Sequence, residues 1–268
     1  MRLSRAAAIV LRQFYLLRGS PSRVFPLFVW VAIDIVLWGF ITRYLGTITH
    51  QPSMDLLPAL LGAVLLWDFL TRVMQGVTMA FFEDVWSRNF LNVFATPMTI
   101  TEYVTGLVLS TIATSSVGLV VMLVVAGAVF GLSMLVYGAM LVPFLLVLFL
   151  FGIALGIIGT AVVLRLGPSA EWFIWPIPAL LSPFVGVFYP LSTLPSWMQA
   201  IARLLPPSYV FEGMRTIVAG GSVSWTTVLM GGGLSMLYIV LAALFFNRVF
   251  RHAVRTGLIA RYSAESVS

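Results

Sequence analysis

The sequence predicts an all-α polytopic membrane protein, on three observations: its composition, its long apolar runs and the uneven placement of its arginines. Of the 268 residues, 60% are hydrophobic and only 9% are charged, and the mean hydropathy is +1.05. Soluble domains are close to 25% charged, so a water-soluble fold could not cover this much apolar surface. The apolar runs reach the length of about 20 residues that a spanning helix needs, which favours helices over a β-barrel.

Six membrane-spanning helices are predicted from these runs. Each is long enough to cross a hydrocarbon core of about 30 Å. We expect one transmembrane domain over residues 1–268, made of an interfacial helix (1–23), a six-span bundle (24–248) and a cytoplasmic tail (249–268). The predicted spans are residues 24–44, 56–81, 103–130, 135–164, 172–189 and 225–246.

The arginines predict the orientation of the bundle. With both termini in the cytoplasm, most arginines fall in inner segments, whereas only Arg43, Arg203 and Arg215 fall in outer ones. Basic residues concentrate on the cytoplasmic side of membrane proteins. The sequence therefore predicts a multi-pass protein of the cytoplasmic (inner) membrane with both termini inside.

An N-terminal amphipathic helix is predicted over residues 2–17. On a helical wheel Leu3 and Phe14 fall on one side, and Arg5 and Arg12 fall on the other. Such a helix lies in the membrane interface, with its arginines against anionic lipid headgroups. This reading assigns the net charge of +6 to lipid contact and not to nucleic acid. A solvated basic tail is the alternative.

The residue types that are missing exclude several chemistries. The chain has no cysteine, and all 15 of its basic residues are arginine. It therefore has no disulfide, no thiol nucleophile and no P-loop lysine of its own. The two histidines, His50 and His252, are far apart in the sequence, which disfavours a histidine metal centre or catalytic triad. We expect no cofactor or metal in this chain, and no enzymatic activity of its own.

Three charged residues fall inside predicted spans: Asp34 in the first, and Asp68 and Arg72 in the second. A charge at mid-membrane costs about 2.5–3.5 kcal/mol on insertion scales. Asp68 and Arg72 are four residues apart and can pair on one helix face. Asp34 and Arg72 lie at similar depths, so a bridge between the two spans is also possible. The cluster is either a neutralised structural pair or a functional relay or substrate contact.

Small residues are predicted to let helices approach closely. Gly152, Gly156 and Gly159 form a stripe on the fourth span, and Gly127 and Gly131 form a GxxxG pair.

The loop between spans two and three, residues 81–103, predicts a short amphipathic helix at the inner surface. Its aromatic residues recur every fourth position: Phe82, Trp86, Phe90 and Phe94. A separate charged stripe is formed by Glu83, Asp84, Ser87 and Arg88. Thr96-Pro97 should end the helix. The helix is either a connector resting on the membrane or a docking element for a cytoplasmic partner.

The segment 184–215, FVGVFYPLSTLPSWMQAIARLLPPSYVFEGMR, is too apolar for a solvent loop and too rich in proline for one span. We expect two short helices, 197–205 and 209–218, with Ser196 and Ser208 as their N-caps. Neither could cross a membrane. The segment therefore predicts re-entrant helices in the outer leaflet, and an ordinary structured outer loop is the alternative.

This segment resembles the signature region of the permease subunits of type-2 ABC exporters, in which prolines, aromatics and then a Glu and an Arg follow in order. The matching positions, which the resemblance implies form the outer gate, are Pro190, Pro195, Trp197, Pro206 or Pro207, Tyr209, Glu212 and Arg215. Glu212 and Arg215 can pair on one helix face. The doubled Pro206-Pro207 departs from the commoner single proline.

The loop 81–103 is also similar to the coupling-helix region of that family, with Thr96-Pro97 and Glu102 in the usual order. The positions expected to contact an ATPase are Glu83, Asp84, Trp86, Arg88, Asn89, Phe90 and Pro97. The resemblance implies an ATP-driven exporter in which this chain pairs with a second copy or a related permease. Two P-loop ATPase subunits would hold the ATP and Mg²⁺.

Two alternatives come from other classes of protein. One is a proton-coupled secondary transporter that uses Asp34, Asp68 and Arg72. The other is an intramembrane enzyme in which Asp34 and Asp68 form a catalytic pair. The family exports polysaccharides, lipid-linked glycans, drugs and peptides, and the sequence does not choose among these substrates.

Overall fold

The computed structural model describes residues 3–49, 57–87, 89, 92–93, 95–167 and 170–258. All regular secondary structure in these residues is helical, as the sequence predicts. In chain order the elements are α1 (Leu3–Arg18), α2 (Pro21–Thr49), η1 (Leu57–Leu61), α4 (Gly62–Trp86), α6 (Ile100–Phe130), η2 (Met134–Met140), α7 (Leu141–Leu166), α8 (Glu171–Ile174), α9 (Pro176–Val185), η4 (Leu191–Thr193), α10 (Ser196–Ala202), α11 (Pro206–Val218) and α12 (Trp225–Arg255).

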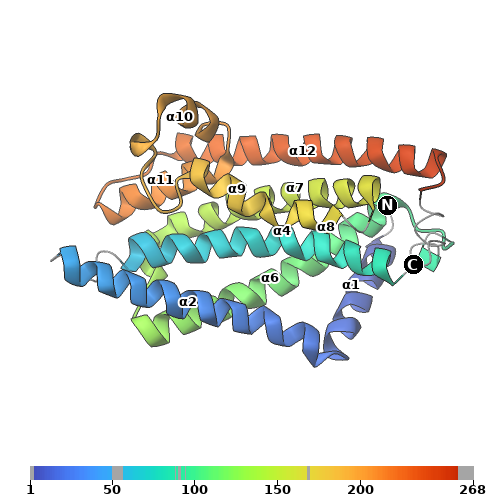
Figure 1. Ribbon diagram of the computed structural model, residues 1–268, viewed down its shortest axis with the longest axis horizontal. Coiled ribbons are helices and arrows are strands. Elements are labelled where there is room, and N and C mark those ends of the chain that lie inside the picture. Colours follow the sequence, from blue (N-terminus) through green and yellow to red (C-terminus); the bar gives the residue numbers. More distant parts are fainter. Residues whose placement is uncertain are drawn as a thin grey trace.

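The long helices run side by side and place particular segments at each end of the bundle (Figure 1). We call one end the α1 end, because α1, the end of α4, the start of α6 and the end of α12 all lie at it. We call the other the α11 end, which carries α10 and α11. Helix α1 turns back sharply from α2 at Gly19 and packs across α6. The predicted tail residues 249–255 continue α12 as regular helix.

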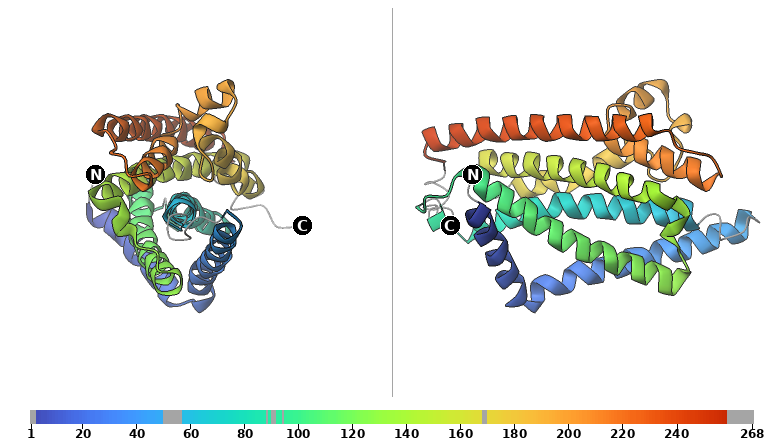
Figure 2. Two further views of the ribbon diagram at one scale, coloured as in Figure 1. Left: turned by 90° about the vertical axis from the view of Figure 1, so that its left-hand side faces the viewer. Right: turned by 180° about the vertical axis from the view of Figure 1, so that it is seen from behind.

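Helix α4 is the central element of the bundle (Figure 2). Seen end-on, it is surrounded by the other long helices, and it packs against α7, α6 and α2. Leu65, Leu66, Leu70 and Val73 of α4 are completely buried. The centre of the helix bundle is therefore filled by side chains.

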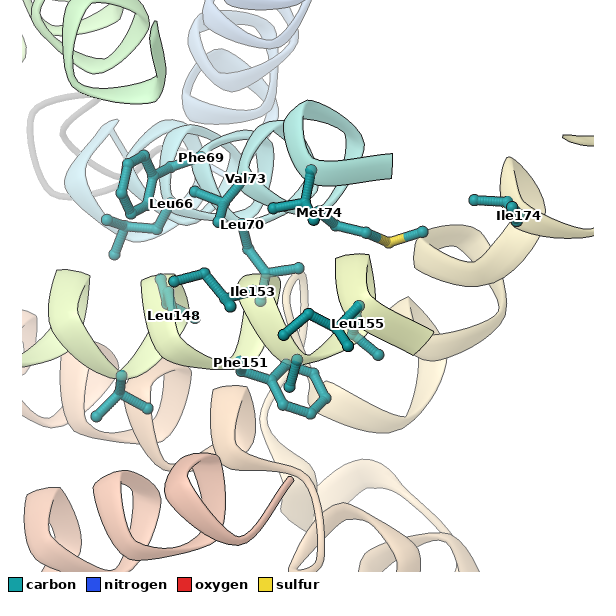
Figure 3. Packing of buried hydrophobic residues seen from close by; sticks show 14 of the residues in the cluster. Leu66, Phe69, Leu70, Val73, Met74, Leu148, Phe151, Ile153, Leu155 and Ile174 are labelled. Carbon is teal, nitrogen blue, oxygen red and sulfur yellow. The ribbon is translucent and has the colours of Figure 1, made fainter. Parts of the chain in front are cut away.

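The core between α4 and α7 is apolar and tightly interdigitated (Figure 3). Leu70 and Val73 of α4 face the α7 side chains around Leu148 and Ile153. Phe151 of α7 lies on the opposite side, where its ring meets that of Tyr238 of α12 edge-on at 5.2 Å between centroids. Helix α7 thus joins the central helix to α12.

Glycines bring α4 and α7 into close backbone contact. A Cβ added at Gly156 would lie 2.7 Å from the Cβ of Val77, and one at Gly152 would lie 2.9 Å from the Cβ of Val73. The hydroxyl of Thr78 also donates a 3.2 Å hydrogen bond across this interface to the carbonyl of Gly156. The predicted small-residue stripe on the fourth span is confirmed.

The Gly127–Gly131 pair has a different role from the one predicted. Gly131 has a φ of 71°, a left-handed conformation that suits glycine, and it ends α6. A Cβ added at Gly127 would meet only the carbonyl oxygen of Leu132, at 3.5 Å. Gly131 therefore ends a helix, and neither glycine makes a close helix–helix contact among the described residues.

Within the described residues, four helical segments are long and apolar enough to cross a membrane: Pro58–Val85, Ile100–Phe130, Met134–Leu166 and Trp225–Arg255. A shorter apolar stretch, Trp172–Val185, covers the predicted fifth span, and it is divided into α8 and α9. Helix α2 has 29 residues. The chain is a helical multi-pass membrane protein, and the number of six spans stays a prediction.

The α4–α7 contact gives a first testable prediction. Replacing Gly156 by Ala should destabilise the bundle by about 1–3 kcal/mol, the usual range for overpacking, because the new methyl group has no room against Val77. The measurement is thermal unfolding of the purified protein in detergent. Gly233→Ala on α12 is the matched control, since nothing lies within 4 Å of a Cβ there. If the two variants unfold at the same temperature, the close contact is not a constraint on stability.

Candidate functional site

Polar side chains that sequence reasoning singled out form three separate groups in the structure. We call them the α1 cluster, the α11 cluster and the central cluster. The α1 cluster contains Arg5, Arg12, Asp84, Glu102 and Tyr103. The α11 cluster contains Glu212 and Arg215 with the backbone of residues 186–191. The central cluster contains Asp34, Asp68 and Arg72.

Asp84 is the centre of the α1 cluster and is fully buried, with 0% of its surface exposed. Arg12 of α1 donates hydrogen bonds to both of its carboxylate oxygens, the bond from Nη1 to Oδ2 being 2.9 Å. The hydroxyl of Tyr103, on α6, also donates to Oδ2. The hydrogen bond to Asp84 raises the pKa of the Arg12 guanidinium, and burial opposes this only in part. Three helices therefore meet at one carboxylate.

Glu102 forms the second half of the α1 cluster. Thr99 and Glu102 make a reciprocal capping box at the start of α6, in which Glu102 accepts a 3.0 Å bond from the Thr99 backbone N–H. The same carboxylate oxygen accepts a 3.2 Å bond from Nη1 of Arg5. One glutamate thus caps the start of α6 and also holds α1. The Thr-x-x-Glu spacing before an apolar run is a sequence signature for such a cap.

Arg5 and Arg12 of α1 therefore pair with protein carboxylates, which the sequence did not predict. Contact of the α1 arginines with lipid headgroups stays a prediction. The predicted apolar side agrees with the structure better, since Leu3 and Phe14 are exposed on the bundle surface. Helix α1 also crosses α6 at Gly106, where an added Cβ would lie 2.6 Å from the Cβ of Ile9.

The predicted amphipathic helix over residues 81–95 is not a separate element in its first part. Residues 81–86 complete α4, and Phe81, Phe82 and Val85 are buried there. The predicted exposed charged stripe is wrong at Asp84, because the carboxylate points into the bundle to meet Arg12. Phe82, the first aromatic of the four-residue spacing, lies on a core-facing helix, which has the same periodicity as a surface one.

The remaining positions expected to contact an ATPase lie at or after the end of α4. Trp86 is the last residue of that helix. Glu83 and Asn89 are half-buried, and Pro97 is exposed in the loop before α6. Three predicted loop residues lie outside the described residues: Arg88, Phe90 and Phe94. The loop therefore begins and ends on helices that the α1 cluster fixes.

The α11 cluster confirms the predicted pairing of Glu212 and Arg215, whose nearest side-chain atoms are 3.1 Å apart. The Arg215 guanidinium also donates to the backbone carbonyls of Gly186 and Tyr189, the latter at 2.8 Å. Glu212 accepts a 2.8 Å bond from the backbone N–H of Leu191. Burial lowers the pKa of Arg215, and the neighbouring Glu212 opposes that shift. This pair closes the chain reversal that follows α9.

The short helices of segment 184–215 form close to where they are predicted, but their start signals differ. Helix α11 begins at Pro206, with prolines at its first two positions, where their missing N–H groups cost nothing. The predicted N-cap Ser208 is therefore inside α11 and buried, and its hydroxyl has no hydrogen-bond partner among the described residues. Ser196 is the first residue of α10 and makes no capping bond. With the doubled proline at its first two positions, the helix starts three residues earlier than predicted, at Pro206 instead of Tyr209.

The other predicted gate residues surround these helices. Pro190 and Pro195 flank η4 and precede α10. Trp197 is exposed, and its ring meets that of Phe184 edge-on at 6.3 Å between centroids. Tyr209 donates a 2.8 Å bond to the carbonyl of Arg203. These residues, which are close together in the sequence, thus pack into one compact structure at the α11 end.

The central cluster lies within the bundle, away from both ends. The charges of Asp34, on α2, and Asp68, on α4, both act on Arg72 of α4. Arg72 in turn reaches α6, where an added Cβ at Gly118 would lie 3.0 Å from its Cδ. The structure therefore brings together the three residues that the sequence placed inside the spans.

The fold and the three clusters define a helical multi-pass membrane protein with a polar structure at each end of its bundle. The sequence profile described as ABC-2 type transporter matches residues 6–219. The chain belongs to this family and is a membrane-embedded transport subunit, a permease. A comparison with curated protein sequences found no match.

The α1 cluster gives a second prediction. Arg12→Leu should lower the free energy of unfolding by about 1.5–3 kcal/mol, because it removes charged hydrogen bonds and leaves a buried carboxylate. Arg18→Leu, at an exposed arginine of the same helix, should have almost no effect. Chemical denaturation in detergent measures both. Equal losses would mean that α1 is not held through Asp84.

The α11 cluster gives a third prediction. Arg215→Met should make the segment between α9 and α11 more susceptible to limited proteolysis, because the carbonyls that follow α9 lose their shared donor. Arg203→Met, at an exposed position one short helix away, is the matched control. An unchanged cleavage pattern in Arg215→Met would show that the chain reversal does not depend on the guanidinium.

Proposed function

We propose that the chain is the transmembrane subunit of an ATP-driven exporter, coupled through its α1 end to a separate ATPase. Membership of the ABC-2 type transporter family supports a permease that works with such a partner. The chain has no lysine with which to build a P-loop. ATP and Mg²⁺ would therefore be held by the partner, and no hydrolysis would occur in this chain.

The observation that carries this proposal is the anchoring of the loop between α4 and α6. Asp84 lies just before the loop and Glu102 just after it, and both carboxylates are fixed to α1 by arginines. The loop itself presents exposed residues, among them Ser87, Ala95 and Pro97. Because both ends of the loop are fixed to helices, a partner that moves the loop would also move α4 and α6, and the loop alone would not absorb the movement. This is the geometry that a coupling surface needs.

A complex of two permeases and two ATPases is the assembly we propose. Because α4 fills the centre of the helix bundle with buried side chains, a single copy offers little space for a substrate to pass through. The pathway would then run between two copies, or between this chain and a close relative. Each copy would contact one ATPase.

In this proposal the α1 end faces the cytoplasm and the α11 end forms the outer gate of an inner-membrane exporter with six spans. The arginine distribution supports this orientation. Helices α10 and α11 have 7 and 13 residues, too few to span, which suits re-entrant helices in the outer leaflet. The Glu212–Arg215 pair would hold that gate together.

The test uses the absence of cysteine from the chain. Ser87→Cys and Ala95→Cys place a single thiol at exposed loop positions. After labelling with a photo-activated crosslinker in native membranes, both variants should capture a P-loop ATPase, identified by mass spectrometry. Ser192→Cys, exposed at the α11 end, is the matched control and should capture none.

Two results would contradict the proposal. If no ATPase is captured from the loop and none co-purifies with the chain in mild detergent, the ATP-driven mechanism is wrong, and a proton-driven carrier that uses Asp34, Asp68 and Arg72 becomes the better account. If the ATPase is captured only from Ser192→Cys, the coupling surface has been assigned to the wrong end of the bundle.

A further inference from the structure

A stripe of polar residues runs along the contact between α4 and α6. Gly76 of α4 faces Thr111 of α6, since a Cβ added at Gly76 would lie 2.7 Å from Cγ2 of Thr111. Gly118 of α6 likewise faces Arg72 of α4. Ser115 lies four residues beyond Thr111 and three before Gly118, so it shares their helix face. These contacts place Ser115 level with Arg72 in the helix seam. We call this contact the α4–α6 seam.

Four oxygen atoms in or beside this seam are buried and have no hydrogen-bond partner among the described residues. They are Oδ2 of Asp68, Oγ1 of Thr71, Oγ1 of Thr111 and Oγ of Ser115. Thr111 and Ser115 are each only 2% exposed. A buried polar group without a partner costs about 1–3 kcal/mol. Asp68 shares the helix face of Arg72, and Thr111 and Ser115 lie on the facing side of α6, so three of the four atoms lie along this contact. Bound water or an ion is the usual partner of such buried groups.

Other buried hydroxyls in the bundle show that this is not the general behaviour of the chain. Thr160 donates to the carbonyl of Gly156 at 2.8 Å, and Ser110 donates to that of Leu107 at 2.8 Å. Ser235, on α12, donates to the carbonyl of Val147 on α7 at 3.1 Å. Gln13 of α1 and Ser208 of α11 also have a buried side-chain atom without a partner, so such groups are most numerous on α4 and α6 but are not confined to them.

The charge of the seam is also unbalanced. Asp34 and Asp68 contribute two carboxylates, and Arg72 contributes one guanidinium. Helix α6 brings no ionisable residue between Tyr103 and its end at Phe130. With both carboxylates ionised, these three described residues carry one net negative charge, which is strongly disfavoured inside a membrane-spanning bundle.

We propose that the α4–α6 seam is a hydrated internal site for a small monovalent cation such as Na⁺. The carboxylate of Asp68 and the hydroxyl of Thr71, three residues apart on α4, would be its protein ligands, because hard cations prefer oxygen. The hydroxyl of Ser115 would bind the accompanying water, which needs two or more polar partners in a buried place. The cation neutralises the seam and holds α2, α4 and α6 together. This site does not depend on the proposed ATPase coupling.

The first test measures thermal unfolding of the full chain in lipid nanodiscs. At constant ionic strength, replacing N-methyl-D-glucamine chloride by NaCl should raise the midpoint temperature, and the rise should saturate as the site fills. Asp68→Asn should abolish this response to Na⁺. Glu212→Gln removes a carboxylate at the α11 end and should respond to Na⁺ as the unmodified chain does.

The second test measures water access and charge at the seam. Ser115→Cys should react with a cationic methanethiosulfonate reagent much faster than with an anionic one, and Na⁺ should slow the cationic reaction. Ser235→Cys is the matched control: it is equally buried, at 0% exposed, but its hydroxyl is satisfied by protein. It should react with neither reagent.

Three outcomes would overturn the inference. No reaction at Ser115→Cys means that the seam is dry. Equal reaction with both reagents, without an effect of Na⁺, means that it holds water only. If acidification stabilises the protein and Na⁺ does not, the seam takes a proton in place of a metal cation. The thiol test stands by itself if Asp68→Asn does not fold.

Discussion

The close contact between α4 and α7 is the constraint on which the rest of the structure depends. Inside a bilayer the hydrophobic effect does not drive helices together, so association relies on van der Waals packing and a few hydrogen bonds. Gly152 and Gly156 supply the first, and the bond from Thr78 to the Gly156 carbonyl supplies the second. Once this pair is formed, α6 and α12 have rigid surfaces to pack against, and both polar ends take their positions from it.

The ends of the bundle are held by charge in a way that the middle is not. Asp84 and Glu102 meet arginines of α1, and Glu212 meets Arg215 in a structure shared with backbone carbonyls. In each case the charged group is satisfied by several donors or acceptors, which is what a buried ion pair requires to be tolerated. The central cluster lacks such complete satisfaction at Asp68 among the described residues. The charged groups at the two ends are therefore fully paired within the protein, whereas Asp68 in the central cluster is not fully paired among the described residues.

Much of the helical fold, the glycine stripe and the Glu212–Arg215 pair could be predicted from local sequence. Helical period, small-residue spacing and the three-residue separation of opposite charges are local signals, and no long-range information is needed to read them. The partners of Asp84 and Glu102 could not be predicted in this way, because Arg12 and Arg5 are 72 and 97 residues distant. The end of α4 was misread for a related reason. A helix that buries Phe81 and Phe82 has the same period as one that rests on a membrane, and only the position of α1 distinguishes them.

Helix α4 connects all three polar clusters through one rigid element. Asp84 lies near its end, in the α1 cluster, and Asp68 and Arg72 lie near its middle. At its start it continues from η1, where Tyr137 donates a hydrogen bond to the carbonyl of Pro58. A continuous helix cannot shorten between these points, so a displacement at the loop after Trp86 must also move the central cluster relative to α2 or α6. In the proposed mechanism, in which an ATPase acts on the α1 end, that action would reach the polar residues of the seam through α4.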